Sequence, residues 1–279
     1  YQAQVAAMLG LADPTLPDGE REAKSIDDLQ TLLARVGRQI AFSLDSTASR
    51  AEHSLTHDKP RFAFFQVFQP RGGGKRQAPT FDVIAPGVAK HEEEIVLAPG
   101  AEPAADPNLV LRVAVAAAEF GLPIAPGTLR NLKKCPIGDR NWTDESRELF
   151  IRLLASGPAL LNVWEDIDFI DVPGKLIPEW LGVRNRPSAS AAHRYTIDRH
   201  MVEVVTRLGR ETPSGGRYDD RHYEALLLAG ILHDIGKRRS ACDRGRGTHG
   251  SRPRHRPLGH AAGTRASDIV GVRHRPQSQ

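Results

Sequence analysis

A histidine and an aspartate stand side by side at positions 233 and 234, at the end of the apolar run LLLAGILHDIGK (226–237). Placing two such side chains directly after a buried segment costs several kcal/mol unless they are paired or bind a metal. An imidazole and a carboxylate together suit Mn, Fe or Zn, or Mg when more oxygens are present. We therefore predict that His233 and Asp234 are catalytic residues that hold a divalent metal ion.

A third ligand is expected from His200, at the start of the amphipathic segment IDRHMVEVVTRLG (197–209). The next segment, 221–236, reads as a helix that is apolar nearly all round, which is typical of the centre of a helix bundle. If these two helices pack together, His200 faces the pair. Adjacent helix positions differ by about 100°, so His233 and Asp234 can converge on one ion. The alternative interpretation is a polar pair at a helix end that binds no metal.

The sequence around these three residues resembles a known family. HRYTIDRHMVEVV (193–205), about two dozen residues and then LLLAGILHDIGK resemble the HD superfamily of metal-dependent phosphohydrolases. More narrowly, they resemble the bifunctional uridylyltransferase/uridylyl-removing enzymes that modify the nitrogen-signalling PII protein. The resemblance covers roughly residues 1–237, and its most specific pieces are LIPEW (176–180) and HRYTIDRH (193–200). The segments before 193 look like the helical region that precedes the HD domain in actinobacterial-type members.

The resemblance implies a domain organisation and a reaction. The family order is a nucleotidyltransferase domain, a helical linker region, an HD domain and two ACT domains. Residues 1–192 would be the helical region, with an irregular β-containing insertion at about 57–100, and 193–237 would begin a truncated HD domain. His200, His233 and Asp234 would ligate the metal, with Mg or Mn expected.

In that site a metal-activated water would attack the phosphodiester between UMP and a PII tyrosine. UTP would be used by the nucleotidyltransferase domain and glutamine sensed by the ACT domains, both missing here. We therefore expect a fragment that is inactive alone.

Residues 238–279 depart from the family pattern. In the family, the HD motif continues into further helices that bring the last HD aspartate, whereas Lys237 is followed here by Arg-Arg-Ser-Ala-Cys. This tail has four large aliphatic residues and no aromatic, too few to offset backbone entropy. We predict that it is disordered, and our hypothesis is a reading-frame shift or misplaced gene end in a GC-rich gene. Asp268 is the tail carboxylate that we consider as a replacement ligand.

Composition and charge narrow the class of protein. The chain has 279 residues, of which 40% are apolar, and no apolar stretch approaches the ~20 residues of a membrane span. It has no recognisable secretory signal, and its two cysteines favour a reducing, cytoplasmic location and argue against a cysteine-built zinc site. Residues 1–236 carry a net charge of −5 and residues 237–279 carry +9. The tail could contact nucleic-acid phosphates, but it has no interleaved aromatics, so we expect no nucleic-acid partner and no membrane.

Other motifs are weaker. Asp166 and Asp168 have the spacing of a nucleotidyltransferase magnesium pair but lack its Gly-Ser turn and strand, so a solvated helix face is preferred. RGGGKR (71–76) lacks P-loop spacing and reads as a linker. His193 is considered as a contact to phosphate or to a metal ligand, against a position in a loop. His222 is interpreted as a surface residue in the turn.

The predicted fold is mainly α, with a small irregular β insertion followed by the first helices of an HD-type bundle and the basic tail. Ser25 is expected to begin one helix, Asp106 and Pro107 a second, and Thr143 a third. RFAFFQVFQP (61–70) and EIVLAP (94–99) are predicted to be short strands.

The sequence is also compatible with two other functions. A stand-alone HD-type nucleotide phosphohydrolase would need a fourth ligand and a tightly bound metal. A non-catalytic helical interaction module, with a vestigial His-Asp pair, would bind none.

Overall fold

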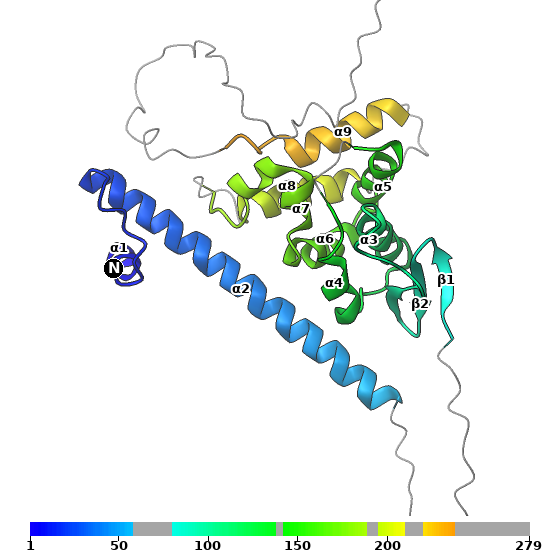
Figure 1. The fold of residues 1–279 in the computed structure, drawn as a ribbon. Helices are drawn as coiled ribbons and strands as arrows, with labels where there is room; N and C mark the ends of the chain where they lie inside the picture. The colour runs from blue at the N-terminus through cyan, green and yellow to red at the C-terminus, as the bar shows by residue number, and fades with distance from the viewer. Residues whose placement is uncertain (58–79, 138–141, 189–194, 210–219, 238–279) are drawn as a thin grey trace, which may run out of the picture.

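A computed structural model describes residues 1–57, 80–137, 142–188, 195–209 and 220–237. These residues are mainly helical, with one small antiparallel sheet, so the predicted fold class is confirmed (Figure 1). No helix in these ranges combines the length and apolar character needed to cross a membrane. The predicted strand at 61–70, the 71–76 linker and the 238–279 tail lie outside the described residues.

The N-terminal part is a helical hairpin. Helix α1 (Gln2–Met8) packs beside the N-terminal end of α2 (Asp18–His57), which runs as one 40-residue helix along the side of the body (Figure 1). The prediction that Ser25 begins this helix is wrong, because α2 starts at Asp18. The Ser25 hydroxyl instead donates to the carbonyl of Arg21 at 2.7 Å, a bond that lets a buried serine lie inside a helix.

The apolar residues of α2 are only partly covered. Leu29 is 4% exposed, but further along the helix Leu33, Val36, Ile40 and Leu44 are between 40% and 63% exposed. The side of α2 that faces the body carries Arg38 and Phe42, and the Phe42 ring stacks on Phe169 at 3.9 Å between centroids. The attachment of α2 to the body is therefore largely polar and aromatic.

The predicted β insertion is a three-stranded meander. Strands β1 (Asp82–Ala85), β2 (Val88–His91) and β3 (Glu94–Leu97) pair antiparallel in the order β1-β2-β3. The predicted strand 94–99 corresponds to β3 and is confirmed. Gly87 adopts a φ of 76° in the β1–β2 turn, where a Cβ would lie 2.7 Å from Leu109, so both conformation and space require glycine.

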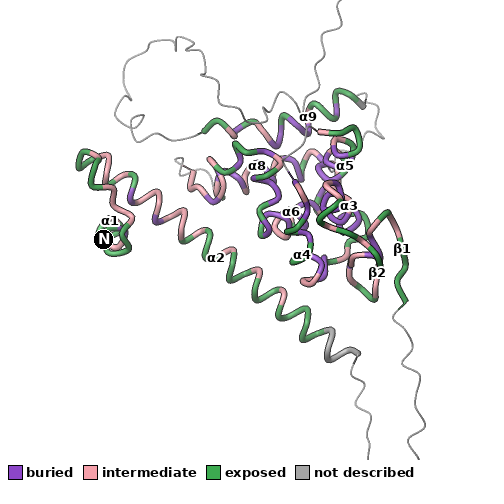
Figure 2. Tube along the Cα trace, in the orientation of Figure 1, coloured by how far each residue is buried: buried purple, intermediate pink, exposed green. Residues whose placement is uncertain are grey.

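Five helices and one 3-10 turn build the core beside the sheet. They are α3 (Leu109–Phe120), α4 (Pro126–Leu132), α5 (Asp144–Leu154), α6 (Ala159–Phe169), α7 (Val172–Leu176) and η1 (Pro178–Gly182). Trp164 and Trp180 are each 1% exposed and meet edge to face at 5.2 Å in this core. Figure 2 shows the buried residues concentrated in these helices and in α8, with α2 mostly exposed.

The other two predicted helix starts, at Thr143 and at Asp106 and Pro107, have different outcomes. Thr143 caps α5 as predicted, and Ser146 completes a reciprocal pair of cap hydrogen bonds. The prediction that Asp106 and Pro107 begin α3 is wrong, since the helix starts at Leu109 after Asn108. The Asp106 carboxylate instead accepts a hydrogen bond from the Asn108 backbone N–H and pairs with Arg112. Asp106 therefore lies before the helix and is not its first residue.

Helices α8 (Ile197–Leu208) and α9 (Asp220–Leu232) pack against each other at the end of the body away from the sheet (Figure 1). The predicted helix 221–236 ends earlier than expected, at Leu232. Its last residues form turns in which Ile235 donates to the Leu232 carbonyl and Lys237 to the Asp234 carbonyl. His233 and Asp234 therefore follow the helix and do not lie on it.

Candidate metal centre

Three candidate ligands meet where α8 and α9 pack. His200 lies in the first turn of α8, and His233 and Asp234 lie in the turn after α9. One ligand atom from each residue lies within 4.8 Å of the other two. The two imidazole rings are 5.3 Å apart between centroids and meet edge to face. The three side chains that the sequence singled out are thus neighbours in space.

The close approach of the two helices depends on Gly230. A Cβ at this position would lie 2.9 Å from Leu208 Cδ1 and 3.1 Å from Val205 Cγ2, both on α8. Those distances are shorter than ordinary carbon contacts of about 3.5–4.0 Å. The missing side chain lets α9 lie against α8, and this brings His233 within reach of His200.

A hydrogen bond orients the ring of His233. Its Nδ1 lies 2.8 Å from the Gly230 carbonyl oxygen, which can only accept, so Nδ1 carries the proton. In the neutral ring the lone pair is then on Nε2, which lies 3.5 Å from Asp234 Oδ2. A backbone carbonyl that fixes the tautomer in this way is the usual partner of a metal-binding histidine.

Asp234 is a buried carboxylate with cationic neighbours. Burial on its own raises the pKa of Asp234, but the hydrogen bond from Lys237, the charge of Lys237 and the charges that His233 and His200 carry when protonated outweigh it, and the net pKa is lowered. Lys237 Nζ donates to Asp234 Oδ2 at 2.8 Å. Asp234 is therefore ionised at neutral pH, and its Oδ2 is held by an ammonium group where a metal cation would bind.

The donor set fits a divalent transition metal. Two imidazoles and one carboxylate suit Mn, Fe or Zn. Two atoms that bind one ion at about 2.1 Å each lie at most about 4.2 Å apart, so side-chain rotations that close less than about 1 Å would complete the arrangement. Three protein ligands leave coordination positions for water and substrate oxygens. The geometry is compatible with a metal centre of the catalytic type.

Other predicted residues lie elsewhere. His193 and Asp268 fall outside the described residues, and His222 is exposed as expected but lies in helix α9 and not in the preceding turn. Asp168 does not lie on a solvated face as predicted: it is 4% exposed and pairs with Arg38 and Arg184. Asp166 lies two residues earlier on α6, where burial and the charges of Glu165 and Asp45 raise the pKa of Asp166 to about 7.

Two polar features of this region were missed by sequence reasoning. Lys237 follows Asp234 by three residues in the stretch HDIGK, and this short separation is a signal for the ion pair that the structure shows. Arg38 lies 160 residues before its partner Asp198. A contact between such distant positions leaves no periodic pattern in a single sequence.

Known proteins similar to this chain share one description. The "Bifunctional uridylyltransferase/uridylyl-removing enzyme" of Streptomyces coelicolor is 35% identical over 238 residues, 85% of this chain and 26% of the relative. Its namesake from Mycobacterium tuberculosis is 34% identical over 213 residues, 76% of this chain and 24% of the relative. The one from Corynebacterium glutamicum is 34% identical over 132 residues, 47% of this chain.

No protein-family sequence model and no solved structure matches the chain. The chain spans about a quarter of the length of the Streptomyces and Mycobacterium relatives. Over most of its own length, it is homologous to one segment of the bifunctional uridylyltransferase/uridylyl-removing enzymes, and it belongs to that family.

Proposed function

We propose that this chain contributes the metal site for uridylyl removal in a PII-modifying enzyme of nitrogen regulation. The reaction is hydrolysis of the phosphodiester that joins UMP to a tyrosine of PII. The observation that carries the proposal is the convergence of His200, His233 and Asp234 within 4.8 Å, in a chain whose relatives are described as uridylyl-removing enzymes.

Each residue has a role that follows from its surroundings. The Gly230 carbonyl keeps the Nδ1 proton of His233 in place, which points the Nε2 lone pair toward the centre. Asp234 supplies negative charge, and His200 supplies the second imidazole from α8. Bound Mn or Mg would lower the pKa of a ligated water and neutralise charge that develops on phosphorus. Lys237, once released from Asp234, is a cation beside the site that suits a phosphate oxygen.

The proposal includes a division of the chain and a location. Residues 1–192 form the helical region of the parent enzyme, and 193–237 form the first part of an HD domain. Transfer of UMP from UTP and the response to glutamine belong to segments of the parent other than this chain. The buried free thiol of Cys135 is compatible with a cytoplasmic location.

A binding experiment tests the proposal without relying on turnover. The purified chain is titrated with a peptide that carries a tyrosine–UMP phosphodiester, with and without Mn²⁺. We expect binding only when Mn²⁺ is present and loss of binding in His233→Ala and Asp234→Asn. His222→Ala, an exposed histidine on α9, is the matched control and should bind as the parent chain does. Binding of the peptide that does not depend on Mn²⁺ would contradict the proposal.

Two further outcomes separate the alternatives. Rapid hydrolysis of free nucleotides with one tightly bound metal per chain would favour a stand-alone phosphohydrolase. Absence of metal binding, with only a small packing loss in His233→Ala, would favour a helical interaction module. UTP-dependent labelling of PII by this chain would show that the transferase activity has been assigned to the wrong segment.

A further inference from the structure

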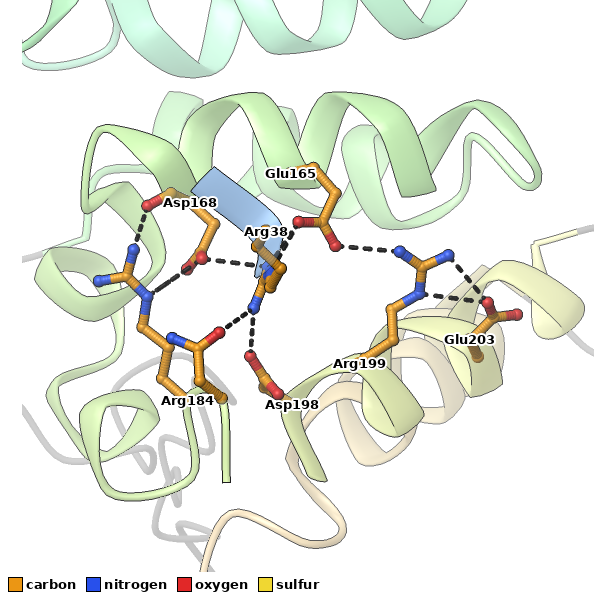
Figure 3. A network of polar contacts seen from close by, with 8 residues as sticks. Arg38, Glu165, Asp168, Arg184, Asp198, Arg199 and Glu203 are labelled. Carbon is orange, nitrogen blue, oxygen red and sulfur yellow. Dashed lines mark hydrogen bonds and ion pairs between the residues drawn. The ribbon is translucent and has the colours of Figure 1, made fainter. Parts of the chain in front are cut away.

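Arg38 joins the long helix α2 to two helices of the body. Its guanidinium donates to Glu165 Oε2, Asn185 Oδ1 and Asp198 Oδ2, each at 2.8 Å, and lies 3.1 Å from Asp168 Oδ2 (Figure 3). Its side chain is 25% exposed, so water is largely excluded from these contacts. All three nitrogens of one arginine are used, which fixes both the position and the plane of the group.

The same network holds the first turn of α8. Asp198 is 1% exposed, and its Oδ2 pairs with Arg38 at 2.8 Å. The next residue, Arg199, donates to the other oxygen of Glu165, at 3.0 Å, and also pairs with Glu203 (Figure 3). Two successive residues of α8 are thus tied, directly or through Arg38, to a single carboxylate on α6. This arrangement resists both rotation and sliding of the α8 N-terminus.

His200 lies on the opposite side of that turn. Positions 198 and 200 differ by about 200° around the helix axis, so Asp198 faces Arg38 of α2 while His200 faces His233 in the turn after α9. A rotation of α8 that moves Asp198 away from Arg38 must carry His200 sideways. The His200 backbone N–H donates to the Thr196 carbonyl at 2.8 Å, so a helical hydrogen bond closes the turn that carries both Asp198 and His200.

We propose that Arg38 is a positioning residue for the metal centre, acting through Asp198 to set the place of His200. This inference rests on the metal site proposed above. It gives α2 a role beyond packing, because Arg38 links this helix to α8, which carries the ligand His200. The opposite face of α2 carries the exposed residues Leu33, Val36, Ile40 and Leu44. Removal of a group that orients a metal ligand typically weakens metal affinity 10–100-fold, and we expect the lower end because Arg38 acts through one intermediate residue.

The test compares variants of the whole chain. Arg38→Met keeps most of the length of the side chain and removes the guanidinium group, while Arg38→Lys keeps the positive charge. Arg35→Met, on an exposed turn of the same helix, is the matched control. Leu132→Ala, fully buried in α4 away from α8, lowers stability without touching the network. Mn²⁺ affinity is measured by calorimetry, and a cross-relaxation signal between the His200 and His233 rings is measured by NMR without metal.

We expect Mn²⁺ binding to weaken about tenfold in Arg38→Met, with Arg38→Lys between it and the parent chain and Arg35→Met unchanged. The ring–ring signal should be lost or reduced in Arg38→Met alone. Unchanged Mn²⁺ affinity and ring contact in a folded Arg38→Met would overturn the proposal, as would equal weakening in Leu132→Ala. If the parent chain shows the ring contact and its dependence on Arg38 but binds no Mn²⁺, the proposed function fails and the positioning role stands.

Discussion

Substituting alanine for Gly230 tests whether the packing of α9 on α8 brings the residues of the proposed metal centre together. Inside a helix, replacing glycine with alanine raises the free energy of unfolding by about 0.5–1 kcal/mol, which by itself would stabilise the protein. The added methyl, however, would lie 2.9 Å from Leu208 and 3.1 Å from Val205. Overpacking of this kind typically costs about 1–3 kcal/mol. We expect Gly230→Ala to lower the free energy of unfolding by about 1 kcal/mol net.

Gly37→Ala is the matched control, because Gly37 lies inside α2 and a methyl group added there would have nothing within 4 Å. It should stabilise the protein by about 0.5–1 kcal/mol. The two variants make the same chemical change, so urea unfolding followed by circular dichroism should shift in opposite directions. Gly230→Ala should also weaken Mn²⁺ binding, since the displaced residue 230 carries the carbonyl that orients His233. Equal stabilisation by both changes would refute the packing argument.

Three further predictions follow from single contacts. Asp166→Asn should raise the free energy of unfolding at pH 8 by about 1–2 kcal/mol, a screened fraction of the shift, and change it little at pH 4. Because the pKa of Asp166 in the folded chain is raised to about 7, the folded chain holds a proton that the unfolded chain has lost, and the stability of the parent chain falls as pH rises from about 4 to 7. The assay is chemical unfolding at a series of pH values, and Asp82→Asn, at an exposed position, is the control. Lys237→Met should tighten Mn²⁺ binding in calorimetry, because the ammonium competes with the cation for Asp234; weaker binding would contradict this. Thr143→Ala should lower the free energy of unfolding by about 1 kcal/mol through loss of the α5 cap, and an unchanged urea midpoint would contradict it.

Local patterns were enough to predict the elements that carry the site. The apolar spacing after Thr196 and the apolar run before His233 indicated α8 and α9, and the structure places both helices as neighbours. The cap at Thr143 follows from side-chain chemistry that acts over three residues. The closeness of His200 to the pair was inferred from the expected packing of the two helices, and the structure brings them together.

Features set by distant contacts were not predictable from a single sequence. Asp168 belongs to an ion network with Arg38, from a helix 130 positions earlier in the chain, so its burial could not be inferred from the local stretch. The end of α9 at Leu232 was missed because the same apolar residues fit a helix or a turn, and the bond between Ile235 and Leu232 selects the turn. Composition alone does not distinguish these two backbones.

The central claim is that His200, His233 and Asp234 share one divalent ion. The most direct measurement is the stoichiometry and affinity of Mn²⁺ for the purified chain, compared with His200→Ala. One ion per chain, lost or greatly weakened in His200→Ala and retained in His222→Ala, is the predicted result. No bound ion in the parent chain, or binding that is indifferent to the loss of the imidazole at position 200, would contradict the account.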